Sequence, residues 1–328
     1  MGERAGMGTF LVTGAAGFLG SHLSERLVAS GHRVRGLDCF RDYYSPALKR
    51  THLEGLAGHP AFQLVEADLA TADLSALVEG CDGVFHLAAQ AGVRSSWGQE
   101  FHCYTRDNVL ASQRVFEACR GREGCPVVYA SSSSVYGDAE TMPTPEETVP
   151  RPISPYGVSK LAVEHLARIY HASFGVRAVG LRYFTVYGPR QRPDMAFHRF
   201  LRRAVLDQPI PVFGSGRQTR DFTYVDDAVT ATVAAMESGA PGGVYNIGGG
   251  ARTTLLRTLE ILEVHLGRPI AREPMDAQTG DVGHTSAETS RARLDLGYAP
   301  EVGMEEGLGR MVAWFLDAWQ DRPELREA

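Results

Sequence analysis

Short apolar segments rich in β-branched residues alternate with amphipathic helical patterns through the first half of this chain. Such alternation is typical of a parallel sheet covered by helices on both faces, because parallel strands need long, usually helical, crossovers. Strands are predicted at Thr9–Thr13, Arg33–Leu37, Phe62–Val65, Gly83–Leu87, Val127–Ser131 and Ala178–Tyr183. Longer helices are predicted over Tyr104–Cys119 and Tyr156–Phe174. We therefore expect an α/β fold with a doubly wound parallel sheet.

The rhythm changes after about residue 185, where glycine, proline and arginine become denser. A helix over Val225–Met236 and a strand over Val244–Ile247 are predicted to return to the sheet. Helices near Thr254–Leu266 and Met304–Trp319 are predicted to belong to a smaller C-terminal lobe. The 328 residues thus suit one large domain or two closely packed ones.

Composition excludes several classes of protein. A hydrophobic share of 44% and a charged share of 22% exclude general disorder, and a net charge of −6 gives no support for a nucleic-acid partner. No apolar stretch reaches the ~20 residues of a membrane span. The five cysteines include no C-x-x-C pair, and no His, Cys, Asp or Glu spacing predicts a metal site. Free thiols fit a reducing compartment, so we expect a cytoplasmic protein with no membrane partner.

Three glycines, Gly14, Gly17 and Gly20, follow the first strand and open the first helix. Glycines there let backbone N–H groups approach a pyrophosphate at the helix N-terminus. Asp38 ends the second strand ~20 residues later, where an acid binds the adenosine ribose and repels a 2′-phosphate. The pattern favours NAD over NADP, and the flanking arginines keep NADP as the lesser alternative. Asp68 follows the third strand and either faces the adenine or caps the next helix.

The chain contains only two lysines, Lys49 and Lys160. Lys160 follows Tyr156 by four residues at the start of a predicted helix, so the two share one face. A free tyrosine has a pKa of about 10, and an ammonium group one turn away favours the phenolate and lowers that pKa. We expect the pair to act as a base, and we expect Lys49 to be an exposed surface residue.

These features, with the run Ser131–Gly137, resemble the extended short-chain dehydrogenase/reductase family. The chain is similar to the nucleotide-sugar epimerases and dehydratases of that family over nearly its whole length. The resemblance implies a Rossmann domain that binds NAD, a lobe that binds a UDP or dTDP sugar, and a homodimer formed by the two long helices. The boundaries expected are 8–184 with returning segments at about 223–247 for the first, and 185–222 with 248–320 for the second.

The resemblance also assigns roles to individual residues. Tyr156 would be the base, Lys160 would bind the nicotinamide ribose, and Ser132 would hydrogen-bond the reacting hydroxyl. The cofactor contacts implied are Gly14, Gly17, Phe18, Leu19, Gly20, Asp38, Asp68, Leu69, Leu87, Ala88, Ala89, Tyr156 and Lys160.

Family members begin alike, with hydride transfer from sugar C4 to NAD, and diverge at the resulting 4-keto sugar. Dehydratases carry Asp-Glu where this chain has Ser133 and Ser134, and UDP-glucuronate decarboxylases carry Glu at the second position. These absences leave epimerisation, in which hydride returns to the opposite face. The segment from Tyr183 to Pro189, with Thr185 where UDP-galactose epimerases have Asn, resembles UDP-glucuronate 4-epimerases.

We therefore expect C4 epimerisation of UDP-glucuronate to UDP-galacturonate. The alternatives are a UDP-glucose or UDP-N-acetylglucosamine 4-epimerase and, from another class, a non-catalytic NAD-binding sensor. The hydroxyl groups of Ser133, Ser134 and Thr185 are expected to bind the sugar carboxylate. Arg192 either steers that carboxylate or holds its loop in place.

The remaining substrate contacts concern the nucleotide. The segment Gln218–Phe222 resembles the family segment that approaches the diphosphate. Arg220 is the residue expected to bind there, because a guanidinium can bind two phosphate oxygens at once. Phe213 is expected to border the uracil, and Gln278 stands where galactose epimerases have a second phosphate-binding arginine. Arg94 is expected near the phosphates, the alternative being an ion pair with Glu100 or Asp107.

Overall fold

A parallel sheet of seven strands forms the centre of the computed structural model, which describes residues 7–122, 124–276, 283–323 and 325. The strand order is β10-β6-β5-β4-β1-β2-β3, and every adjacent pair runs parallel. The strands are β1 (Thr9–Thr13), β2 (Arg33–Asp38), β3 (Phe62–Glu66), β4 (Gly83–His86), β5 (Val127–Ser132), β6 (Ala178–Tyr183) and β10 (Val244–Ile247). The predicted strands are confirmed, and their boundaries agree within one residue.

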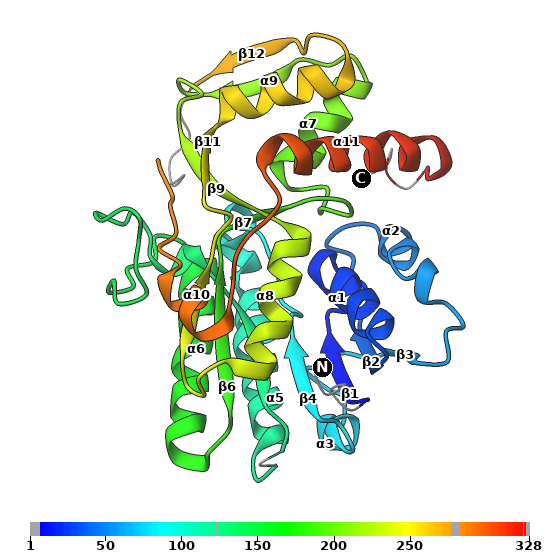
Figure 1. The fold of residues 1–328 in the computed structure, drawn as a ribbon, viewed down its shortest axis with the longest axis vertical. Coiled ribbons are helices and arrows are strands. Elements are labelled where there is room, and N and C mark those ends of the chain that lie inside the picture. The colour runs from blue at the N-terminus through cyan, green and yellow to red at the C-terminus, as the bar shows by residue number, and fades with distance from the viewer. Residues whose placement is uncertain (1–6, 123, 277–282, 324, 326–328) are drawn as a thin grey trace.

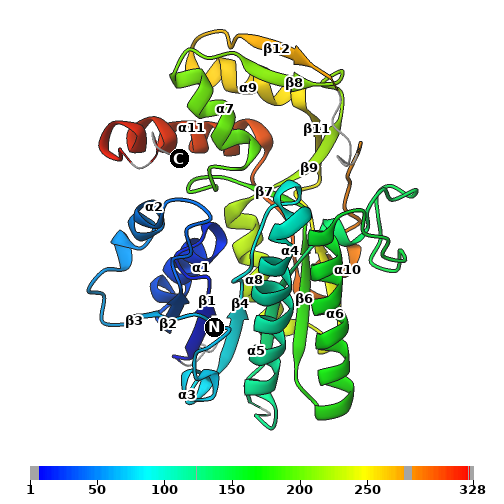
Figure 2. The same ribbon diagram turned by 180° about the vertical axis from the view of Figure 1, so that it is seen from behind.

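Helices cover both faces of this sheet (Figures 1 and 2). One face carries α1 (Phe18–Ala29) and α8 (Val225–Ser238), and the other carries α3 (Leu74–Val78), α5 (Ala111–Cys119) and α6 (Pro155–Phe174). Chain order reverses on either side of β1, which is followed by β2 on one side and by β4 on the other. Parallel α/β sheets bind ligands in the crevice at such a point, outside the carboxyl ends of the strands.

The predicted helix over Tyr104–Cys119 is not a single α-helix. Its first residue ends α4 (Phe101–Tyr104), and a wider π-helical turn, Thr105–Leu110, connects α4 to α5. Asn108 lies in this turn, where its side chain accepts from the Gln90 backbone N–H at 2.7 Å and donates to the Ser159 hydroxyl at 2.9 Å. These buried hydrogen bonds explain the irregular turn better than apolar periodicity can.

The other elements are mostly gathered above the carboxyl ends of the strands (Figure 1). There β7 (Thr185–Tyr187), β9 (Thr219–Tyr224) and β11 (Ala251–Thr254) form a three-stranded sheet, and β8 (Ile210–Phe213) pairs with β12 (Arg272–Met275). The helices here are α7 (Ala196–Val205), α9 (Leu255–Leu266) and α11 (Met304–Asp321), while α2 (Pro46–Thr51) follows β2 and α10 (Ser290–Leu296) lies near β10. The predicted domain boundaries stay a prediction.

One hydrophobic cluster joins the two layers. It contains Val12 of β1 and Leu23 of α1, and it continues through Tyr187 of β7 to Phe197 of α7 and Phe315 of α11. Apolar packing of this extent fixes the upper elements over the strand ends and so sets the walls of the crevice. None of the helices in the described part of the chain combines the length and apolar character that crossing a membrane requires.

Candidate active site

A single cleft of about 1470 Å³ lies between the strand ends and the upper elements. Its cofactor end, as we call it, contains the loop Gly14–Gly20 and Asp38, and its sugar end contains Thr185 and Arg192. Ser132, Tyr156 and Lys160 also line it, between these ends. The structure thus brings together the described residues that the sequence analysis selected, whereas Gln278 lies outside the described residues.

The glycine loop is tightly folded against the sheet. Gly14 has a φ of +71°, and a Cβ atom there would lie 2.8 Å from the Ala88 nitrogen. A Cβ on Gly20 would lie 2.0 Å from the Gly14 carbonyl oxygen, so neither position admits a side chain. The loop leads into the N-terminus of α1, whose first N–H groups have no partner within the helix. Such a cradle of main-chain donors fits a pyrophosphate.

Asp38 is fixed beside this loop. Its carboxylate accepts hydrogen bonds from the backbone N–H groups of Ala16 (3.1 Å) and Phe40 (2.8 Å). The side chain is 9% exposed and faces the cleft at the end of β2. This placement fits the predicted contact with a ribose, because a carboxylate accepts hydrogen bonds from a sugar diol.

Lys49 was wrongly predicted to be exposed. It is 7% exposed and lines the cleft, where its amino group donates to the Arg41 carbonyl and lies 4.7 Å from the centre of the Tyr44 ring. Burial lowers the pKa of Lys49, and the negative charge of Asp38 opposes that shift. The sequence did contain a hint of this role. Lys49 is one of only two lysines in the chain, and it follows the adjacent tyrosines Tyr43 and Tyr44.

Asp68 lines the cleft next to Leu69 and does not cap the following helix. The cap of α3 is Asp73, whose carboxylate accepts from the Ala76 N–H at 3.2 Å. Asp68 instead accepts from the Ala70 N–H at 2.8 Å and forms ion pairs with Arg41 and Arg106. The sequence left two roles open for Asp68, facing the adenine or capping the next helix. Its position in the cleft is compatible with the first.

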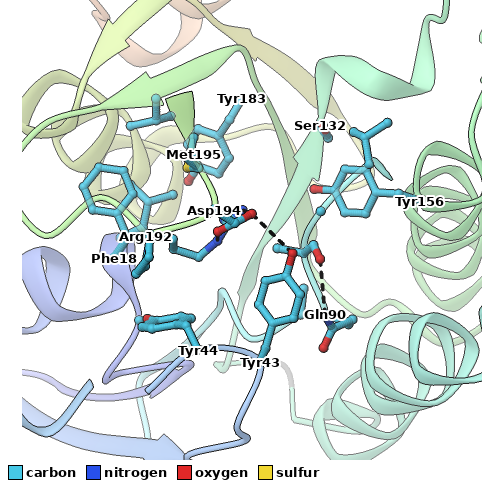
Figure 3. Close-up of a pocket in the computed structure, with 18 of the residues that line it drawn as sticks. Phe18, Tyr43, Tyr44, Gln90, Ser132, Tyr156, Tyr183, Arg192, Asp194 and Met195 are labelled. Atoms are coloured by element: carbon cyan, nitrogen blue, oxygen red, sulfur yellow. Dashed lines mark hydrogen bonds and ion pairs between the residues drawn. The ribbon is translucent and has the colours of Figure 1, made fainter. Parts of the chain in front are cut away.

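Helix α6 positions two of the three expected catalytic residues. It begins at Pro155, with the Ser154 hydroxyl accepting from the Gly157 N–H at 3.1 Å. A Cβ on Gly157 would lie 2.5 Å from the Ser134 carbonyl oxygen, so this glycine allows the helix to approach the serine run. Figure 3 shows Tyr156 and Ser132 together on one wall of the cleft, with the phenol oxygen facing inward.

The electrostatics of Tyr156 differ from the expectation. Burial raises the pKa of Tyr156, and the charge of Arg192 and a hydrogen bond with Ser132 counteract that rise in part. The Lys160 amino group donates to the Ala130 carbonyl at 2.9 Å and lies 6.0 Å from the Tyr156 ring centre, while its expected contact with the nicotinamide ribose stays a prediction. Burial and the charge of Arg192 lower the pKa of Lys160 to about 8. The positive charge that lowers the pKa of Tyr156 in this structure is that of Arg192.

Arg192 reaches the cleft from the wall opposite Tyr156 (Figure 3). Its guanidinium makes two hydrogen bonds of 3.0 Å to the carboxylate of Asp194, which also accepts from the Tyr43 hydroxyl at 3.2 Å. This arrangement matches the loop-holding role, since the fork of the arginine is bound within its own loop. Tyr43 is a cleft residue that the sequence analysis missed, and Asp194, part of the Arg192–Ala196 segment that resembles UDP-glucuronate 4-epimerases, was given no role of its own.

The nucleotide contacts expected at the sugar end also line the cleft. The Arg94 guanidinium lies 5.5 Å from the centre of the Phe213 ring, and Arg220 donates to the Thr219 carbonyl at 3.0 Å. Asp107, one alternative partner of Arg94, forms ion pairs with Arg41 and Arg106. Three further arginines line the cleft from α7, and their spacing on one helical face is a signal that was overlooked: Arg199, Arg202 and Arg203.

Comparison with known proteins agrees with this geometry. The model of the NAD dependent epimerase/dehydratase family matches residues 10–248. The chain belongs to this family. NAD as the cofactor, the Rossmann-type α/β fold and the enzymatic class expected from the sequence are thereby confirmed.

Several relatives of this family cover nearly the whole chain. A Bacillus subtilis protein called uncharacterized UDP-glucose epimerase YtcB is 44% identical over 314 residues, which are 94% of this chain and 98% of that protein. The crystal structure of UDP-glucuronic acid 4-epimerase from Bacillus cereus, in complex with UDP-glucuronic acid and NAD, superposes with a TM-score of 0.91. It is 41% identical and covers 94% of this chain and 99% of its own.

A third relative has a different sugar. The UDP-N-acetylglucosamine 4-epimerase from Methanobrevibacter ruminantium M1, in complex with UDP-N-acetylmuramic acid, superposes with a TM-score of 0.88. It is 32% identical and covers 95% of this chain and 99% of its own. Solved structures similar to this chain thus carry different UDP-sugars.

Proposed function

We propose that this protein is an NAD-dependent 4-epimerase that interconverts UDP-glucuronate and UDP-galacturonate. The observation that carries the proposal is the hydroxyl-lined wall beside Tyr156. Ser133, Ser134 and Thr185 line the cleft there, and they carry neither the acid pair of a dehydratase nor the glutamate of a decarboxylase. Three hydroxyl donors suit a sugar carboxylate, which a protein carboxylate at the same place would repel.

The residues at the cofactor end fit NAD. The main-chain cradle formed by Gly14–Gly20 would hold the pyrophosphate, Asp38 the adenosine ribose, and Lys160 the nicotinamide ribose. Bound NAD supplies an acceptor and donor of hydride at the sugar C4. Phe18, Leu19, Leu87, Ala88 and Ala89 line the same end and would complete its walls.

Tyr156 would take the proton of the sugar 4-hydroxyl, and Ser132 would hold that hydroxyl against the phenol. Arg192 faces the phenol across the cleft and favours its ionised form. Because Arg192 is already bound to Asp194, its charge is partly neutralised toward the sugar. A 4-keto glucuronate is a β-keto acid, which loses CO2 when the electrons of the C5–C6 bond move to the C4 keto oxygen. Hydroxyl donors on the carboxylate stabilise its charge and oppose that loss, and a partly neutralised Arg192 gives little help to an enolate at C4. The sugar would therefore keep its carboxylate while hydride returns to the other face.

The UDP group would occupy the arginine-rich part of the sugar end. Arg220 and Arg94 are our choices for the diphosphate, and Phe213 for the uracil edge. The three cleft arginines of α7 offer further cations for the same group. In the sequence, Gln278 stands at the position at which galactose epimerases have a second phosphate-binding arginine. Guanidinium groups bind phosphate oxygens in pairs, so such a cluster suits a diphosphate.

We infer a cytoplasmic homodimer as the working form. Apolar side chains stand exposed on the π-helical turn before α5 and along α6, namely Leu110 (47%), Val158 (48%), Ile169 (46%) and Phe174 (45%). A second copy of the same helices would cover them in a symmetric four-helix interface. Light scattering of the purified protein tests this, and a monomer at micromolar concentration would contradict it.

A substrate panel tests the proposed function. The purified protein is incubated without added cofactor with UDP-glucuronate, UDP-glucose or UDP-N-acetylglucosamine, and NMR reads the configuration at C4. We expect conversion of UDP-glucuronate with retention of its carboxylate. The names of the B. subtilis and M. ruminantium relatives favour the neutral sugars as a second candidate. Conversion of the neutral sugars alone would establish that second candidate and reject the first.

A further inference from the structure

A buried ion pair lies behind the serine run, outside the cleft. Glu164 follows Tyr156 and Lys160 by one further helical turn of α6, and it is 8% exposed. Arg182 of β6 is 4% exposed, and its Nε and Nη2 atoms donate to the two Glu164 carboxylate oxygens at 2.9 and 2.7 Å. Neither residue lines the cleft, so the reaction does not use them directly.

The ion pair is tied to the strand that carries Ser132. The Ser131 hydroxyl donates to Glu164 Oε1 at 2.5 Å. On the other side, Arg182 Nη1 donates to the Tyr136 hydroxyl at 2.7 Å, and that hydroxyl donates to Asn246 Oδ1 at 2.7 Å. The network therefore links α6 to strands β5, β6 and β10 through side chains alone.

Successive turns of α6 contact neighbouring residues of β5. Tyr156 lies beside Ser132 on one wall of the cleft (Figure 3), Lys160 donates to the Ala130 carbonyl, and Glu164 accepts from Ser131. Apolar packing of Val163 and Ala167 and the Asn108–Ser159 hydrogen bond hold α6 against its neighbours. The paired hydrogen bonds between Glu164 and Arg182 add a directional contact to β6 that resists sliding of the helix along the sheet. A buried ion pair seldom adds net stability over apolar residues of equal volume, and its best-attested use is to set register.

We propose that Glu164 and Arg182 are positioning residues that set the register of α6 on β5. They thereby place the Tyr156 hydroxyl against Ser132 and the sugar hydroxyl. The inference rests on the proposed function, since it concerns the alignment of the proposed base. Misplacing a reacting group by about 1 Å can cost roughly 100-fold in rate, so a small loss of register is enough to matter.

The test compares three variants with the wild type on whichever UDP-sugar the panel shows to be converted. Removing one partner leaves a buried charge unpaired, so the main variant is the double substitution Glu164→Leu/Arg182→Met, which removes both charges. We expect it to fold, to retain NAD, and to lose about 10- to 100-fold in kcat with KM changed less than about twofold. Glu164→Gln keeps one oxygen for Ser131 and Arg182 Nε, but it turns an NH2 group toward Arg182 Nη2 and leaves the buried Arg182 charge unpaired. We therefore expect it to melt at a lower temperature than the double variant and, where folded, to lose less kcat than the double variant because one of the two contacts remains.

Asp227→Asn is the matched control. Asp227 is a buried carboxylate of α8, 6% exposed, that accepts from the backbone N–H groups of Glu301 and Val302 and does not line the cleft. If Asp227→Asn lowers the melting temperature as much as the double variant does, its kcat should still equal that of the wild type. A folded double variant with wild-type kcat, or an equal kcat loss in Asp227→Asn, would reject the positioning role alone. A wild type that converts none of the three sugars would instead reject the proposed function and this role with it.

Discussion

The two ends of the cleft are built from different parts of the chain. The cofactor end is formed by main chain, with the folded loop Gly14–Gly20 and an Asp38 carboxylate held by two backbone N–H groups. The sugar end is formed by side chains from separate loops, which bind one another, as Arg192, Asp194 and Tyr43 do. An amino-acid substitution changes a side chain but leaves the backbone N–H and C=O groups in place. The first end should therefore set whether NAD binds, and the second which sugar reacts.

Tyr156 stands where the two ends meet, and its loss should have the largest effect. In Tyr156→Phe the ring remains but the proton acceptor is gone. General acid–base groups contribute about 10²- to 10⁴-fold, so we expect kcat to fall by that range. NAD content, read from the absorbance of the denatured extract, should match the wild type because the cofactor contacts of the main chain are untouched. Turnover near the wild-type rate would show that another group is the base.

Gly20→Ala tests the main-chain end directly. The added methyl group would lie 2.0 Å from the Gly14 carbonyl oxygen, which has no side chain to move aside. Overpacking costs about 1–3 kcal/mol, which is roughly 5- to 150-fold, so NAD affinity should fall by that range. Calorimetric titration of the apoprotein with NAD measures it. Gly124→Ala is the control, because a Cβ there meets no atom within 4 Å. Equal affinity in both variants would mean that the loop is not a rigid cradle.

The contrast between the ends also explains what could be predicted from the sequence. The strands and Tyr156 with Lys160 were predictable because their patterns are local, within one strand or one helical turn. The pairing of Tyr43 with Asp194 joins residues 151 positions apart, and no local pattern contains it.

The direction in which a side chain points and the degree to which it is buried also could not be predicted from the sequence. Lys160 is one turn from Tyr156 as predicted, but its amino group is bound to the Ala130 carbonyl, so Arg192 supplies the charge that acts on the phenol. Lys49 lies in a polar stretch that reads as surface, because composition does not reveal that Tyr44 covers it. The register set by Glu164 and Arg182 likewise became visible only once β5, β6 and α6 were assembled.

Acid should weaken the cofactor end. Burial lowers the pKa of His52 and His86 to about 3 and that of His22 to about 4, all three in or beside its elements. Because these folded-state values lie below the unfolded value of about 6.5, the unfolded chain alone takes up protons as the pH falls below 6.5. Each histidine therefore lowers the free energy of unfolding by about 1.4 kcal/mol for every pH unit below 6.5, which amounts to about 2 kcal/mol at pH 5.

Urea unfolding at pH 7 and pH 5 measures this loss. His52→Gln should reduce the pH dependence by about 2 kcal/mol over that range, since one neutral group replaces one titrating group. His102→Gln, at an exposed position, is the control and should leave the dependence unchanged. Equal pH dependence in the two variants would contradict the buried, neutral state of His52.

Thr185→Val tests the side-chain end with a nearly isosteric change. The hydroxyl expected to bind the sugar carboxylate is lost, and hydrogen bonds to charged groups contribute about 1.5–3 kcal/mol. We expect kcat/KM for UDP-glucuronate to fall at least about tenfold, because about 1.4 kcal/mol corresponds to a factor of ten. NAD content should not change. An unchanged kcat/KM would remove Thr185 from the carboxylate site and weaken the case for an acidic sugar.

Lys49→Met should have the smallest effect, and it tests whether the cofactor end depends on main chain alone. Methionine keeps the apolar stem against Tyr44 but removes the charge beside Asp38 and the hydrogen bond to the Arg41 carbonyl. One such interaction contributes about 1 kcal/mol, so NAD should bind about 3- to 10-fold more weakly. Arg50→Met is the matched control on the same helix, because Arg50 is exposed and pairs with Glu66 outside the cleft. If both variants bind NAD like the wild type, Lys49 is buried without serving the cofactor, and the main chain with Asp38 is sufficient.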